Sequence, residues 1–191
     1  MTNMEHHDSK NPNSMFKIVI NLMAACIISG LIIATVYSLT YKTAEQNQIE
    51  LTRLSMQNLV ASADEFIEIE GQTDWYEAVK EGQIIAYVVP SESKGYAGSV
   101  KLLVAVKPDL TIMNYVIVES KETPGLGDKA AQEPFIGQFP GKKIENLEVV
   151  KDPSDTEHIL AISGATITSR AVTDAVKKAL VEMQEFLQEG K

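Results

Sequence analysis

An uncharged, largely apolar stretch lies near the start of the chain. It runs from Ile18 to Tyr41, and Lys17 and Lys42 bound it. A helix of this length crosses a hydrocarbon core of roughly 30 Å. We therefore predict a transmembrane helix over residues 15–41, after a disordered tail at 1–14. A cleaved signal peptide is disfavoured because no small-x-small cleavage site ends the run, and a buried core helix would be unusually long for so small a domain.

The pattern changes after the apolar stretch. From Thr43 to about Glu70 apolar residues recur at helical spacing, without Gly or Pro, which predicts a helical stalk. We assign residues 42–80 to this stalk and the entry to a domain that occupies 81–191. Alternating and apolar runs then predict three strands at 84–89, 100–106 and 112–118. The last two of these strands are expected to form a hairpin.

The second half of the chain is expected to add helices and one more strand. A short helix is expected near 130–138, a strand at 147–150 and a strong amphipathic helix that ends the chain. The helix presents one apolar face: Val172, Ala175, Val176, Ala179, Met183 and Leu187. Strands in the middle with helices at both ends predict an α+β fold with an antiparallel-rich sheet and flanking helices.

Composition narrows the function classes. The chain of 191 residues has 17 Lys and Arg against 26 Asp and Glu, a net charge of −9. A general nucleic-acid binder would need a basic face, so no nucleic-acid partner is expected. The single cysteine, Cys26, excludes an internal disulfide, and with only three histidines no metal site is expected.

The stretch Ile162–Ser169 is the most unusual part of the chain, with small and hydroxyl residues just before the last helix. Thr168 or Ser169 is the expected N-cap of that helix. Thr166 would then lie beside unpaired backbone N–H groups and the positive end of the helix dipole, a place that suits a phosphate. An elaborate cap that holds no ligand is the alternative.

Three motifs resemble one known family. Ser163-Gly164-Ala165-Thr166 matches the S/T-G-A-T signature at which a flavin transferase attaches FMN through a phosphoester to the last Thr. Glu122-Thr123-Pro124-Gly125-Leu126-Gly127 is similar to an ETPGLG loop of the same family, and Lys94–Gly98 to its Gly-Tyr-x-Gly entry. In this order, after one N-terminal span, they resemble the FMN-binding domain family of RnfG, from the Rnf electron-transport complex, and NqrC.

The resemblance implies the site residues. Thr166 would carry a covalent FMN, and no catalytic residue is implied. The other cofactor-binding residues implied are Ser163, Gly164, Ala165, Thr168, Glu122, Thr123, Leu126 and Gly127. One position departs from the transferase signature, since the Asp expected three residues before the Ser is Leu160.

The resemblance also implies a function and partners. It implies an electron-transfer subunit of a ferredoxin:NAD⁺ oxidoreductase that couples electron flow to ion translocation. Its partners would be the other membrane subunits and, during maturation, the flavin transferase. The domain would lie outside the cytoplasmic membrane and the tail inside. Two alternatives remain open: an NqrC-like subunit of a sodium-pumping NADH:quinone reductase and, because of Leu160, an unflavinylated assembly or sensory module.

Overall fold

The computed structural model describes residues 12–190, with side chains described at 15–41 and 50–190. Contacts divide the chain into two compact units, Met1–Glu50 and Leu51–Lys191. Residues 1–11 of the expected disordered tail lie outside the described residues. A helix already begins at Pro12, so the last three residues of that expected tail are helical.

The first unit holds most of the long helix α1 (Pro12–Leu59). Within residues Met15–Tyr41 of α1, an 18-residue window reaches a mean hydropathy of 2.4, and every side chain of the stretch is exposed. This stretch is long and apolar enough to cross a membrane, in agreement with the predicted span. Exposing so continuous an apolar surface to water is unfavourable, whereas the hydrocarbon core of a bilayer favours it.

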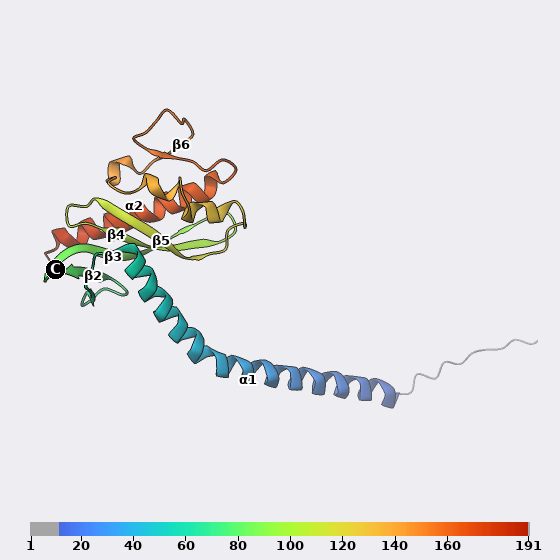
Figure 1. The fold of residues 1–191 in the computed structure, drawn as a ribbon. Coiled ribbons are helices and arrows are strands. Elements are labelled where there is room, and N and C mark those ends of the chain that lie inside the picture. The colour runs from blue at the N-terminus through green and yellow to red at the C-terminus, as the bar shows by residue number, and fades with distance from the viewer. Residues whose placement is uncertain (1–11, 191) are drawn as a thin grey trace, which may run out of the picture. The chain divides into compact units, whose positions relative to one another are not determined.

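An antiparallel sheet forms the centre of the second unit (Figure 1). Its strands follow chain order from edge to edge: β1 (Glu65–Glu68), β2 (Tyr76–Lys80), β3 (Gln83–Lys94), β4 (Ser99–Val106) and β5 (Ile112–Ser120). The three strands and the hairpin expected from alternation are confirmed as β3, β4 and β5. The helix expected to reach Glu70 instead ends at Leu59, because residues 65–68 pair with β2, from Glu65 opposite Val79 to Glu68 opposite Tyr76.

The elements after the sheet are mostly short. Three 3₁₀ turns follow β5: η1 (Gly127–Ala131), η2 (Ile136–Gln138) and η3 (Ile144–Asn146). Two of these turns replace the short helix expected near 130–138. A parallel pair, β6 (Val149–Val150) and β7 (Ile159–Leu160), comes next, and α2 (Thr166–Gln188) completes the described chain. The predicted amphipathic helix is therefore confirmed, and so is the α+β class.

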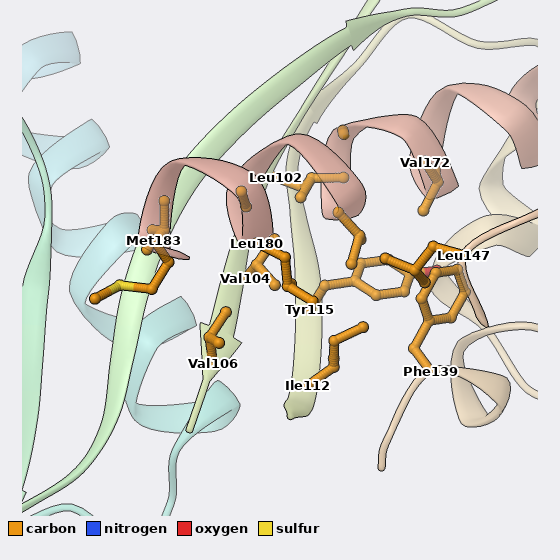
Figure 2. Packing of buried hydrophobic residues seen from close by; sticks show 14 of the residues in the cluster. Leu102, Val104, Val106, Ile112, Tyr115, Phe139, Leu147, Val172, Leu180 and Met183 are labelled. Atoms are coloured by element: carbon orange, nitrogen blue, oxygen red, sulfur yellow. The ribbon is translucent and has the colours of Figure 1, made fainter. Parts of the chain in front are cut away.

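The main core lies between α2 and one face of the sheet (Figure 2). Tyr115 and Phe139 pack edge to face with their ring centroids 4.8 Å apart. The only tryptophan, Trp75, is buried in the same cluster and packs against Phe186, with the two ring centroids 5.6 Å apart. Side chains from α2 interdigitate with those of β4 and β5 here, including Leu102, Val104, Val106, Ile112, Val172, Leu180 and Met183.

A second apolar cluster covers the other face of the sheet. The end of α1 contributes Met56 and Leu59, and the following Val60 is also buried. They pack on the small side chains of Ala78 and Ala86, among others, because alternate residues of a strand point to opposite faces. The sheet is therefore packed with apolar residues on both faces, and the loops that join its strands project from the strand ends.

Candidate functional site

Three loops that are far apart in the sequence meet at the carboxylate of Glu122. Glu122 follows β5, and its Oε1 accepts a hydrogen bond of 2.9 Å from the N–H of Ala97, in the turn between β3 and β4. Its Oε2 accepts a hydrogen bond from the hydroxyl of Thr168, in the first turn of α2. The 94–98 and 122–127 motifs and the Ile162–Ser169 stretch therefore converge on one side chain.

Two glycines let the chain close around Glu122. A Cβ at Gly95 would come within 2.5 Å of Glu122 Oε1, and a Cβ at Gly127 would overlap Glu122 Cβ. At Gly127 the overlap is with the Cβ of Glu122, next to its backbone, so only glycine fits there; at Gly95 a larger residue would displace the Glu122 carboxylate. The 123–127 loop closes on itself, as the N–H of Gly127 donates to the carbonyl of Thr123 over 2.8 Å.

The Glu122 carboxyl is held in its charged form. Burial raises the pKa of Glu122, but hydrogen bonds from Thr168 and from the backbone N–H groups of Ala97, Tyr96 and Gly98 together lower it by more. The pKa therefore lies below its ordinary value. The N–H of Ala97 donates directly to this carboxylate, so the 95–98 turn binds an anion that a side chain of the same protein supplies. The 95–98 turn was not among the expected site residues, although its Gly-rich pattern was the available signal.

Ser163 and Gly164 form an exposed turn that leads into α2. The N–H of Ala165 donates to the carbonyl of Ile162 over 3.0 Å, and Gly164 has a φ of +81°, which favours glycine. Ser169 fixes this turn to the helix: its hydroxyl accepts from the N–H of Ile162 at 2.9 Å and donates to the carbonyl of Ala165 at 3.0 Å.

The expected N-cap of α2 is wrong. The N-cap residue is Ala165, and no side chain caps the helix there. The hydroxyls of Thr168 and Ser169 are used elsewhere, because both residues lie inside the first turn and bond to Glu122 and to the 162–165 turn. Within the part of the chain that the structure describes, the backbone N–H groups of Thr166 and Ile167 have no acceptor.

Thr166 is thus half-buried at the start of α2, next to unpaired donors and the positive end of the helix dipole. Its neighbourhood is apolar and open. Leu126 is 39% exposed, and its Cδ2 lies 3.5 Å from the Cβ position of Gly164, so the 122–127 loop touches the Ser-Gly turn. Ile167 is also exposed.

These residues fit FMN. A phosphate on the Thr166 hydroxyl would meet helix N–H groups that no side chain of the described residues caps. A flat, largely apolar ring needs an exposed apolar contact, which Leu126 offers beside the Ser-Gly turn. Thr123 is exposed in the loop that carries Leu126, whereas Gly127 is buried under it. The structure therefore brings the nine expected residues into one region through Glu122, Leu126 and the start of α2.

Leu160, the position that departs from the signature, lies in β7. Its N–H donates to Gln138 Oε1 over 2.7 Å, and its carbonyl accepts from Gln138 Nε2 over 3.3 Å. It lines a cleft of about 630 Å³ together with Asp155 and His158. A carboxylate therefore lies in the same cleft, but Asp155 is engaged with the backbone and ring of His158.

Comparison with known proteins places this geometry in a family. The model of the FMN-binding domain matches residues 95–181, which include all three motifs from Gly95 onward. The chain is 50% identical over 177 residues to the G subunit of the proton-translocating ferredoxin:NAD⁺ oxidoreductase complex of Clostridium ljungdahlii, covering 93% of this chain and 96% of that protein. It is 29% identical to the G subunit of the Na⁺-translocating ferredoxin:NAD⁺ oxidoreductase complex of Acetobacterium woodii, covering 90% and 93%.

A solved structure resembles the fold. The crystal structure of the C subunit of the Na⁺-translocating NADH-quinone reductase from Parabacteroides distasonis has a TM-score of 0.55 and 24% identity, covering 72% of this chain and 92% of that one. This likeness supports the fold alone. The expected family is confirmed by the relatives among the G subunits.

Proposed function

The chain belongs to the RnfG family of G subunits of ion-translocating oxidoreductase complexes, and we propose that it carries one FMN covalently on Thr166 and relays electrons in a ferredoxin:NAD⁺ oxidoreductase. The observation that carries the proposal is the start of α2. There a threonine hydroxyl, helix N–H groups without a side-chain cap and the exposed Leu126 lie together. Electron flow through this flavin is coupled to ion translocation by the assembled complex.

The attachment reaction needs an outside enzyme. The Thr166 Oγ1 attacks the phosphorus on the FMN side of the FAD pyrophosphate, a new O–P bond forms, the anhydride bond breaks and AMP leaves. The hydroxyl proton passes to a base of the flavin transferase, which also supplies the metal ion. The product is a phosphodiester with one negative charge, which the N-terminus of α2 stabilises.

The bound flavin supplies the redox chemistry, and the protein supplies its position and surroundings. Leu126 gives the ring an apolar contact, while Ser163 and Gly164 leave the approach to Thr166 open because both are exposed. Glu122 and Thr168 hold the loops around the acceptor.

Residues 15–41 of α1 anchor the subunit as a single membrane span. The flavin-bearing domain lies on the outer face of the membrane, where the transferase acts, and the N-terminus lies inside. Its partners are the other membrane subunits of the complex, which bring their cofactors within tunnelling reach of the flavin.

The test compares membranes that contain the complex with wild-type subunit, with Thr166→Ala and with Thr156→Ala, an exposed threonine outside the site. We expect the wild type and Thr156→Ala to support NAD⁺ reduction by reduced ferredoxin with coupled ion uptake, and Thr166→Ala to abolish both. Unchanged turnover in Thr166→Ala would refute the redox role of this site. Turnover that depends on quinone instead of ferredoxin would favour an NqrC-like subunit.

A further inference from the structure

Within the described part of the chain, both oxygens of the Glu122 carboxylate accept hydrogen bonds from the protein itself. Its two oxygens bond to different parts of the chain, Oε1 to the N–H of Ala97 and Oε2 to the hydroxyl of Thr168. Its own N–H donates to the hydroxyl of Ser120 over 3.2 Å, which fixes the residue to the end of β5. The side chain is therefore committed to internal bonds.

The bond to Thr168 is the one that concerns the acceptor. Thr168 lies in the first turn of α2, two residues after Thr166, and is 3% exposed. Among the described hydrogen bonds, its hydroxyl donates to Glu122. Thr168 lies within one helical turn of Thr166, so a bond that holds Thr168 restrains the start of α2.

The bonds to the 95–98 turn fix the other side. Gly95 donates its N–H to the carbonyl of Gly98 over 2.7 Å, so this turn is closed, and the N–H of Ala97 in its middle donates to Glu122 Oε1. Bonds to a charged acceptor are stronger than neutral ones. One carboxylate thus ties the turn after β3, the end of β5 and the start of α2 together.

We propose that Glu122 is a positioning residue, which holds the first turn of α2 and the 95–98 turn in register so that FMN transfer to Thr166 depends on Glu122 and Thr168 acting as one link. This inference rests on the proposed flavinylation of Thr166. Glu122 acts through Thr168 and the turn, and not by touching the flavin. Reactions between positioned groups are sensitive to displacements of about 1 Å, which can slow them about 100-fold.

The test measures the initial rate at which the full-length chain in detergent gains FMN, by intact mass, with a flavin transferase, FAD and Mg²⁺. Variants are Glu122→Ala, Thr168→Val, the double variant and Thr168→Ser, which keeps the hydroxyl. Glu119→Ala is the matched control, because Glu119 is a nearby carboxylate that pairs with Lys101 on the surface. Fluorescence of Trp75 checks that each variant is folded.

We expect Glu122→Ala and Thr168→Val each to slow loading at least tenfold, and Glu119→Ala and Thr168→Ser to load at rates close to wild type. In the double variant, Thr168→Val should add nothing to the effect of Glu122→Ala, because the link is already broken. Effects that multiply would mean independent roles and would overturn the proposal. Loading of Glu122→Ala at the wild-type rate would overturn it as well.

A second readout needs no flavin. Hydrogen exchange of the peptide that contains residues 96–98 is measured on the same chains before loading. We expect faster exchange in Glu122→Ala and Thr168→Val, and wild-type exchange in Thr168→Ser and Glu119→Ala. A wild-type chain that never gains FMN would refute the proposed flavinylation and with it the role of Glu122 in loading. Unchanged exchange in Glu122→Ala would refute the link between the loops separately.

Discussion

Replacing Tyr115 by Phe should destabilise the second unit and loosen the segment next to the flavin loop. Tyr115 is 1% exposed, and its hydroxyl donates to the carbonyl of Ala130, in the turn that follows Gly127. The variant keeps the ring against Phe139 but leaves the carbonyl of a fully buried residue without its partner. An orphaned buried acceptor costs about 1–3 kcal/mol.

The magnitude translates into a measurable shift. A loss of about 2 kcal/mol lowers the Tm of a unit of this size by about 7 °C. The only tryptophan of the chain, Trp75, is buried in the same core, so its fluorescence reports the unfolding of this unit. Tyr96→Phe is the matched control, because the side chain of Tyr96 is 72% exposed and its hydroxyl should contribute little.

Tyr115 should also affect the response to alkaline pH. Burial, with a smaller effect of the charge on Glu133, raises the pKa of Tyr115 well above its usual value. Above pH of about 10 the unfolded chain loses this proton while the folded chain keeps it, so stability falls with rising pH by about 1.4 kcal/mol per unit. The phenylalanine variant lacks this group, so the gap between wild type and variant should narrow above pH 10.

Denaturant midpoints from Trp75 fluorescence at pH 8 and pH 11 measure both effects. If Tyr115→Phe is as stable as Tyr96→Phe at pH 8, the bond to Ala130 contributes nothing to stability, contrary to the expected loss. A gap that stays constant between the two pH values would refute the account of its ionisation.

Three further predictions concern the loops around the site. Gly127→Ala should reduce loading with FMN and lower the Tm, because its Cβ would overlap Glu122; intact mass and Trp75 fluorescence measure both, and a normal Tm would show that the loop can move aside. Leu126→Ala should leave the covalent link in place but shift the flavin's reduction potential, and an unchanged potential in a spectroelectrochemical titration would remove Leu126 from the ring contacts. The hydrogen bond to Asp155 raises the pKa of His158, so this pair stabilises the 152–158 loop fully below a pH of about 6.5 and less as the pH rises through the raised pKa. Hydrogen exchange of that loop, corrected for intrinsic rates, should therefore become faster with rising pH. Equal exchange across the range would argue against a stabilising pair.

The strands that sequence alone predicted are those whose local pattern carries the information. β3, β4 and β5 combine long apolar runs with clear turn residues, so their alternation is visible without the fold. β1 is different, because residues 65–68 hold only two apolar side chains, Phe66 and Ile67, which also fit a helical face. Pairing with β2 decides the outcome there, and that pairing is not encoded within the segment.

The same distinction applies to the site. The Ser163–Thr166 turn and the 122–127 loop stand out in the sequence because glycine and hydroxyl residues are concentrated there. The hydrogen-bond partners of the side chains do not stand out in the sequence, because a partner can be far away along the chain. Thr168, for example, bonds to Glu122, 46 residues away. The local pattern therefore predicted that the hydroxyl of Thr168 or Ser169 caps the helix, which the nearest backbone groups favour. It marked Lys94–Gly98 as a motif but gave no reason to count the 95–98 turn among the site residues.

The most direct measurement of the central claim is the intact and peptide mass of the full-length chain produced with and without a flavin transferase. A gain equal to FMN less one water is expected on the peptide that contains Thr166, only when the transferase is present. Thr166→Ala should show no gain in mass and Thr156→Ala the full gain. Trp75 fluorescence should show that both variants are folded. A wild-type chain without added mass, or a flavin retained by Thr166→Ala, would contradict the central claim.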